Sequence, residues 1–128
     1  MLTKESWVYV TDNTNVKWLK IFQLYKGSFR RFTKEGLFIK GSARVVEPPR
    51  VEYKGFKYKY KIKGDVCRSW ICRSVVKKRY KDHKIILFND NSVLNITKKQ
   101  NLMSKYINGP ASKSTPQKKL LTLFSLVV

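Results

Sequence analysis

The chain has 128 residues, 42% of them hydrophobic and 13% aromatic, which is typical of one folded domain and excludes a disordered basic tail. Lysine and arginine number 28 against 8 aspartate and glutamate residues, so the formal net charge at pH 7 is +20. Solubility needs a net charge of only roughly 2 to 8 in magnitude, so a polyanionic partner, nucleic acid first, is favoured over a merely soluble basic surface.

Two strands are predicted near the start of the chain. Trp7–Val10 is a short strand, and the polar residues 11–15 that follow it favour a turn. Val16–Tyr25 is the second strand. Because Lys17 and Lys20 interrupt its apolar series, one face should be buried and the other partly wet, and we expect Lys17 on the wet face to contact RNA.

A basic loop follows at Lys26–Phe32. Arg30 and Arg31 can bind phosphates bidentately, and they are the main RNA-binding candidates in this segment. Phe29 and Phe32 offer rings for packing or for base stacking. A loop that is simply solvated is the alternative.

The third predicted strand is Leu37–Val46, with the small residues Gly41 and Ala43 in its middle. Small residues there suit a tightly coiled barrel strand or a close backbone approach. Lys40 on this strand is another candidate RNA contact. Two prolines, Pro48 and Pro49, end the strand because proline cannot donate to the ladder.

A hairpin is predicted over Arg50–Lys63, whose later part alternates cations with apolar or aromatic residues. Its lysine row includes the RNA-binding candidates Lys57, Lys59 and Lys61. The alternative is an edge ribbon that the lysines keep soluble, since natural sheets use lysine in this way against aggregation.

Val66–Ile96 predicts a compact β-meander that faces RNA. Its strand-like runs are Val66–Val76, Ile85–Phe88 and Val93–Ile96. Residues 89–92 (Asn-Asp-Asn-Ser) are expected to form a hairpin turn. The run Lys77–Lys81 holds four cations and one ring and is expected to be a turn opposite an anion. It supplies three more RNA-binding candidates, Lys77, Lys78 and Arg79.

The last thirty residues are expected to leave the barrel or sandwich. Thr97–Lys119 is basic and lacks periodicity, so it predicts a connecting arm. Thr115 and Pro116 are typical of a helix start, and they predict a helix over Gln117–Leu126. That helix is apolar nearly all round, so the barrel or a neighbouring protein should cover it. It is far too short to cross a bilayer.

Groups that carry catalysis or bind metals are sparse. Cys67 and Cys72 are five residues apart on one predicted strand, so they should point to opposite faces and form neither a disulfide nor a zinc site. His83 lies in a charged turn, where an exposed structural histidine is favoured over a catalytic one. No carboxylate pair suggests an acid and base, and no phosphate-binding glycine motif occurs. No cofactor or metal is expected.

Residue usage favours an organellar gene. Lysine outnumbers arginine by 21 to 7 and alanine occurs only twice, a bias expected of a genome poor in guanine and cytosine. Met1–Glu5 has neither an apolar signal region nor the pattern of a transit peptide. The protein is therefore expected to be made where it works.

Four segments carry a resemblance to the universal large-subunit ribosomal protein fourteen family, and together they span most of the chain. Val10–Thr14 is similar to the family's V-A-D-N-S, and Ser28–Gly36 to its S-N-R-R-Y-A-x-x-G. Lys63–Arg73 is similar to K-G-D-V-V-R-A-V-I-V-R, and Phe88–Ile96 to F-D-D-N-A-A-V-V-I. Several matched spans in the right order are far more specific than any one of them.

The resemblance implies a mainly β fold: a small closed five-stranded β-barrel with an added hairpin and a short C-terminal helical segment. We take residues 1–97 as the barrel, with the hairpin near 50–63, and residues 98–128 as the arm and helix of the same single domain. Arg30 and Arg31, and Lys77 to Arg79, would inherit contacts with large-subunit rRNA. Ser104, Lys105 and Tyr106 would face protein or small-subunit partners at an intersubunit bridge.

The chain departs from the family pattern at several positions. Asn15 replaces a glycine, which asparagine tolerates because it visits left-handed backbone readily, and His83 stands where a turn glycine is usual. The hairpin near 50–63 is longer than the common form, and residues 111–115 lack the family's V-A-R-E-L-R helix. Such divergence, with the composition, favours a mitochondrially encoded protein of the mitochondrial ribosome.

The leading hypothesis is therefore a structural protein of the large ribosomal subunit that binds rRNA next to other ribosomal proteins. It is not expected to be an enzyme or a membrane protein. A free-standing architectural DNA- or RNA-binding small barrel is the alternative. A basic RNA-modifying enzyme, or a subunit of one, is a third class.

Overall fold

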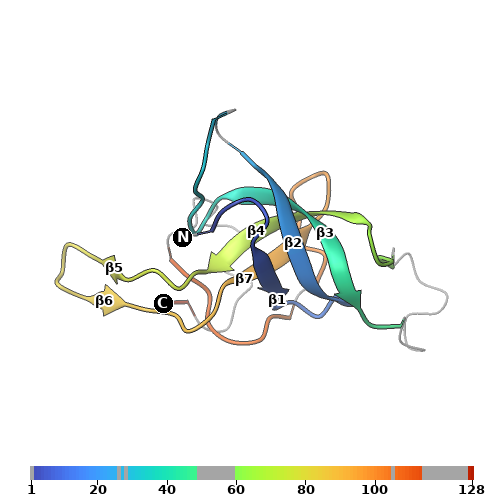
Figure 1. The fold of residues 1–128 in the computed structure, drawn as a ribbon. Helices are drawn as coiled ribbons and strands as arrows, with labels where there is room; N and C mark the ends of the chain where they lie inside the picture. The colour runs from blue at the N-terminus through green and yellow to red at the C-terminus, as the bar shows by residue number, and fades with distance from the viewer. Residues whose placement is uncertain (1, 26, 28, 49–59, 105, 114–126) are drawn as a thin grey trace.

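The computed structural model describes residues 2–25, 27, 29–48, 60–104, 106–113 and 127–128. These residues form seven strands and no helix (Figure 1): β1 Trp7–Val10, β2 Val16–Leu24, β3 Phe38–Val46, β4 Val66–Arg73, β5 Lys78–Arg79, β6 Ile85–Ile86 and β7 Ser92–Ile96. Five of them close into a barrel in the order β1-β2-β3-β4-β7, and β5 pairs only with β6. The mainly β, closed five-stranded barrel is confirmed.

Neighbouring barrel strands are antiparallel except where the barrel closes. There β1 runs parallel to β7, with Tyr9 opposite Ser92 and Val10 opposite Val93. Gly41 lies where β2 and β3 approach closely, since a Cβ at this position would come 3.0 Å from the carbonyl oxygen of Lys20. Gly41 therefore avoids a tight contact with the backbone of β2, which agrees with the close backbone approach that was one of the two predicted reasons for a small residue here.

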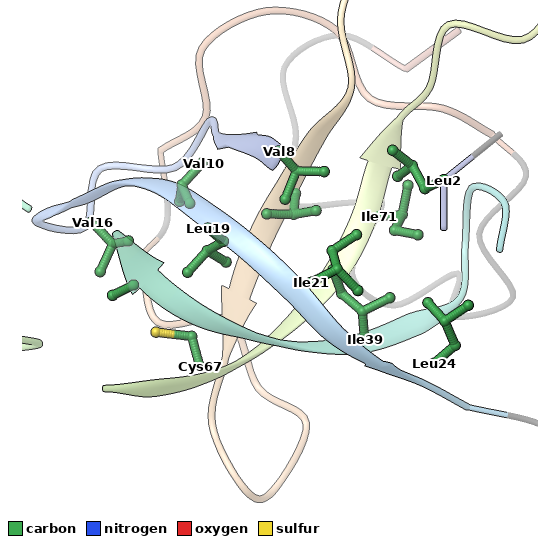
Figure 2. Packing of buried hydrophobic residues seen from close by; sticks show 12 residues of the cluster. Leu2, Val8, Val10, Val16, Leu19, Ile21, Leu24, Ile39, Cys67 and Ile71 are labelled. Carbon is green, nitrogen blue, oxygen red and sulfur yellow. The ribbon is translucent and has the colours of Figure 1, made fainter. Parts of the chain in front are cut away.

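The interior of the barrel is an apolar core of inward-facing aliphatic side chains and one cysteine (Figure 2). Its members come from all five strands and from the segment before β1: Leu2, Val8, Val10, Val16, Leu19, Ile21, Leu24, Ile39, Ala43, Cys67, Ile71 and Val93. Side chains in a strand have a period of two, and β1 follows it with Val8 and Val10 facing inward. In β2 the period is interrupted by register shifts, so its inward-facing residues are Val16, Leu19, Ile21 and Leu24.

A second apolar cluster lies on the outer side of β4 and β7. It is built on Trp70, Cys72, Leu94, Ile96 and Ala111, with Phe38, Leu102, Ile107 and Val127 packed against them. Cys67 belongs to the inner cluster and Cys72 to the outer one, so the predicted opposite orientation of the two thiols is confirmed. Both are free, and burial raises the pKa of each thiol to about 11.

The arm after β7 covers this outer cluster. Two isolated bridges attach it to the barrel, Ile96 to Leu102 and Asp12 to Ile107, and a third joins Ala111 of the arm to Val127 at the end of the chain. Residues 97–104 and 106–113 contain no helix, which agrees with the predicted connecting arm. The helix predicted over Gln117–Leu126 lies outside the described residues.

The prediction of a simple meander over Val66–Ile96 is wrong. Strand β4 pairs directly with β7, and the chain between them forms the separate hairpin β5-β6, which projects from the barrel in Figure 1. Residues 89–92 join β6 to β7, which do not pair with each other, so they are not a hairpin turn. The barrel closes because β7 pairs with β1 and β4. Turn preferences act over a few residues, so they cannot predict which distant strands pair.

The basic run Lys77–Lys81 is also not a turn. Lys78 and Arg79 are strand β5, and the turn falls at residues 80–84, where the Tyr80 amide donates to the Lys84 carbonyl oxygen over 2.9 Å. His83 has a φ of 64°, the left-handed conformation that explains why glycine is usual at this position. An added hairpin therefore exists, but at β5-β6.

The hairpin predicted near 50–63 lies largely outside the described residues, at 50–59. Its described end, 60–62, has no strand, and Gly64 follows in a turn with a φ of 94°. The Asn15 side chain holds this segment: it donates from Nδ2 to the Lys61 carbonyl oxygen (2.7 Å) and accepts from the Lys61 amide at Oδ1 (3.3 Å). Asn15 does not adopt the left-handed backbone that the sequence analysis considered for it.

Candidate nucleic-acid interface

The predicted RNA-binding cations differ in their solvent exposure. Arg31, Lys77 and Arg79 are exposed, and five others are half-buried: Lys17, Arg30, Lys40, Lys61 and Lys78. Lys57, Lys59 and the partner-facing candidate Lys105 lie outside the described residues. The other two partner-facing candidates are described: Tyr106 is exposed and Ser104 is half-buried.

Four half-buried cations already have contacts within the protein. The Lys17 ammonium lies 3.6 Å from Glu47, and the Lys40 ammonium lies over the Tyr25 ring, 5.9 Å from its centroid. Lys61 donates to the Val66 carbonyl oxygen over 3.4 Å. Arg30 donates through Nε to the Phe32 carbonyl oxygen over 2.8 Å, which holds the basic loop in shape. Phosphate contact by these residues stays a prediction.

The basic loop borders a hollow on the protein surface. The hollow has a volume of about 450 Å³ and is lined by Thr3, Lys4, Phe29, Arg30, Arg31 and Phe32. Phe29 is 95% exposed and Phe32 is 50% exposed, so neither ring serves the hydrophobic core. Arg30 and Arg31, predicted together, are thus brought to one site with the two rings.

The outer face of β1–β4 mixes cations with aromatic rings, a surface that sequence reasoning did not identify. Trp7, Trp18 and Phe22 are 51%, 40% and 41% exposed. Lys40 on β3 lies directly opposite Arg68 on β4, and both point outward. Extending a period of two along β2 would have placed Trp18 on the same face as the buried Val16, because the register shifts of this strand are not visible in the sequence.

A buried carboxylate supports the root of the projecting hairpin. The side chain of Glu35 is fully buried, and Lys78 at the start of β5 donates to its Oε2 over 2.6 Å. The Ser112 hydroxyl also donates to Oε2 over 2.6 Å, while the Ser74 amide and hydroxyl donate to Oε1 over 3.0 and 3.1 Å. Lys78 therefore has a structural role besides the predicted RNA contact. No pattern in the sequence indicated that Glu35 would be buried.

A second buried polar network fixes the arm to the barrel through Arg73. The guanidinium donates to the Ser92 hydroxyl (2.7 Å), the Thr11 hydroxyl (3.0 Å) and Asp90 (3.1 Å). Thr11 in turn donates to the Asn108 carbonyl oxygen of the arm over 2.6 Å. Arg73 is only 7% exposed, so it serves the fold and is not available to bind phosphate.

Asp12 anchors a third network at the turn before β2. The Asn95 amide donates to its Oδ2 over 2.9 Å, and the Thr14 hydroxyl donates to Oδ1. Burial raises the pKa of Asp12 above its ordinary value, and these hydrogen bonds partly oppose the rise. The carboxylate thus organises the turn and is no candidate for catalysis.

The described part of the chain offers no enzyme-like cluster. His83 is exposed at the tip of the β5-β6 hairpin among charged residues. Among the described residues no group of three or more histidine, cysteine or acidic side chains could hold a metal ion. No helix in those same ranges is long and apolar enough to cross a membrane.

The model of the family described as Ribosomal protein L14p/L23e matches residues 1–128 of the chain.

Proposed function

Because this chain belongs to the ribosomal protein L14p/L23e family, we propose where on the ribosome it acts and in which compartment. The family consists of structural, non-enzymatic proteins of the large ribosomal subunit that bind rRNA and other ribosomal proteins, and this chain is one of them. The proposal adds three finer points: the residues that contact rRNA, a bridge to the small subunit, and a mitochondrial location.

The net charge of +20 on a small closed barrel is the observation that carries the assignment of rRNA contacts. Cations at this density repel one another and destabilise the compact state unless phosphates neutralise them. Among the predicted cations that the structure describes, Arg31 beside its hollow and Lys77 and Arg79 near the projecting hairpin are the exposed ones. We assign the primary phosphate contacts to these three residues. Lys17, Arg30, Lys40, Lys61 and Lys78 come second, since each already has a contact within the protein.

We assign the bridge to the segment at residues 104–106. Tyr106 is 74% exposed, which is unusual for a tyrosine in a stable fold and favours a partner that covers it. Its amide donates to the Ser104 hydroxyl over 3.3 Å and its carbonyl oxygen accepts from that hydroxyl over 3.5 Å, so the Ser104 side chain lies against the Tyr106 backbone. A small-subunit rRNA surface fits this site in the family context.

A mitochondrial ribosome is the proposed assembly. Lysine outnumbers arginine by 21 to 7 and alanine occurs only twice, which supports an organelle genome poor in guanine and cytosine. The location would be the mitochondrial matrix.

Sedimentation of tagged protein tests the proposal. In a lysate resolved on a sucrose gradient, the wild-type chain should co-migrate with mitochondrial large subunits, and Arg31→Ala should reduce the incorporated fraction several-fold. Lys84→Ala is the matched control, since this exposed lysine lies 3.6 Å from Asp82 and is partly neutralised. Association with bulk DNA, or migration free of any ribosomal particle, would instead support a free-standing nucleic-acid-binding barrel.

A further inference from the structure

We propose that the hollow beside the basic loop binds one unpaired ribonucleotide, with its base against Phe29 and Phe32 and its phosphate on Arg31 and Lys4. The inference rests on the proposed function, since it specifies which form of RNA this part of the surface recognises. Nothing in the family assignment requires a nucleotide pocket at this place. The contacts around the loop are the reason for proposing one.

The walls of the hollow are fixed from both sides. Leu2 and Thr33 exchange backbone hydrogen bonds, Thr33 N to Leu2 O at 2.8 Å and Leu2 N to Thr33 O at 3.3 Å. Leu2 is buried in the barrel core, so this bridge ties Thr3 and Lys4 to the loop and both to the barrel. On the loop side, Arg30 holds the Phe32 carbonyl oxygen. The backbone on both sides of the hollow is therefore tied, to the barrel at Leu2 and within the loop at Phe32.

The exposed rings identify the chemistry of the ligand. Phe29 and Phe32 stand largely in water, which costs free energy that an apolar or aromatic ligand would recover. A nucleobase is such a ligand, and its stacking on aromatic side chains is the usual way in which proteins bind single-stranded RNA. A base paired within a duplex is already stacked on its neighbours, so only an unpaired nucleotide can use these rings. The volume of about 450 Å³ lies in the range of pockets that hold small ligands.

The cations at the hollow supply the groups that would bind the phosphate of the nucleotide. Arg31 and Lys4 are exposed, and within the described part of the chain neither forms an ion pair with a carboxylate. An arginine can hold a phosphate through two parallel hydrogen bonds, and a lysine adds a point charge. Arg30 is the positioning residue, because its Nε is used to hold the loop.

Comparing the affinity of the full-length protein for single-stranded and for duplex RNA separates the contribution of ring stacking from that of charge. The probes are an eight-nucleotide single-stranded RNA that carries a fluorescent adenine analogue and the same sequence annealed to its complement. For the variant Phe29→Ala/Phe32→Ala we expect affinity for the single strand to fall by about 5- to 150-fold and quenching of the analogue to be lost. Duplex affinity should stay unchanged. Arg31→Ala should weaken binding to both probes, since phosphates are present in each.

Leu87→Ala is the matched control, because Leu87 is also an exposed apolar side chain, at 59% exposure, but does not line the hollow. The proposal is overturned if the double variant binds the single strand as tightly as wild type does, if Leu87→Ala causes an equal loss, or if single-strand and duplex affinity fall together. It is likewise overturned if a polyglutamate peptide displaces the RNA equally well from wild type and from the double variant, since the hollow would then be a charged surface alone. Thermal unfolding of each variant checks that the barrel is intact. A wild-type chain that does not sediment with large subunits contradicts the proposed function, whatever the outcome at the hollow.

Discussion

Glu35 is a fully buried carboxylate in a chain with only eight acidic residues, and four donors from three residues satisfy it. A buried charge is tolerated only when it is paired and hydrogen-bonded, since its desolvation cost is high. Lys78 supplies the opposite charge, and the two serines fill the remaining acceptor positions. At the scale of single residues, this network holds together the loop that carries Arg31, the end of β4 and the arm.

Replacing Lys78 by methionine should destabilise the fold more than neutralising Glu35. In Lys78→Met the carboxylate stays buried without its counter-charge, with an expected loss of about 3–5 kcal/mol in unfolding free energy. In Glu35→Gln the Lys78 ammonium, whose side chain is 21% exposed, can turn to water, and the expected loss is about 1–3 kcal/mol. Urea unfolding of both variants and of the double variant measures the coupling. A double variant that is less stable than Lys78→Met would contradict this account.

At the scale of elements, the arm is held to the barrel by few but specific contacts. The Asn108 amide donates to the Thr11 carbonyl oxygen over 2.8 Å, and Arg73 lies beneath the turn that contains Gly109. Gly109 has a φ of 91°, and a Cβ there would meet the Arg73 guanidinium directly. Only glycine allows the arm to cross the buried arginine so closely.

Gly109→Ala should therefore lower the free energy of unfolding by more than the strain of a left-handed backbone alone would. Gly64→Ala is the matched control, since Gly64 has a φ of 94° but no atom lies within 4 Å of the position that a Cβ would take there. We expect Gly64→Ala to lower the free energy of unfolding by about 1–2 kcal/mol, because alanine is strained in left-handed backbone. Gly109→Ala should lose roughly 1–3 kcal/mol beyond that, because displacing Arg73 breaks buried hydrogen bonds to it. Denaturant unfolding gives both values, and faster amide exchange at Asn108 should accompany the larger loss. Equal losses in the two variants would show that Arg73 is not displaced.

At the scale of the whole molecule, charge decides how the barrel behaves. Inside, the core is apolar, and hydrogen bonds satisfy the charged groups of the three buried polar networks. Outside, a net charge of +20 favours any polyanion. The affinity for rRNA should accordingly depend on counterion release more than on base-specific contacts.

Affinity for a large-subunit rRNA fragment should fall steeply with salt. If about 6 to 10 phosphates are contacted, the loss between 50 and 200 mM salt is roughly three to five decades. Arg31→Ala should reduce the slope of log affinity against log salt by about 1, whereas Phe22→Ala should leave it unchanged. Filter binding across a salt series measures the slopes. A flat response in the wild type would rule out phosphate neutralisation as the source of affinity.

The sequence alone was enough to predict the barrel strands and the basic character of the surface. Runs of apolar, β-branched and aromatic residues located β1, β2, β3 and β4 to within a few residues, and the odd spacing of Cys67 and Cys72 placed the two thiols on opposite faces. These features are local, since each depends on the side chains of one strand. Composition likewise sufficed to indicate a polyanionic partner.

Only the tertiary structure decided which segments pair and which charged residues are buried. Strand β7 pairs with both β1 and β4, which leaves β5-β6 as a separate hairpin. Local sequence patterns cannot show that strands so far apart in the sequence pair to close the barrel. Glu35, Arg73 and Asp12 look like surface residues in the sequence, yet each is buried by partners distant along the chain. The cost of burying a charge depends on those partners, so the fold that brings them together had to be known first.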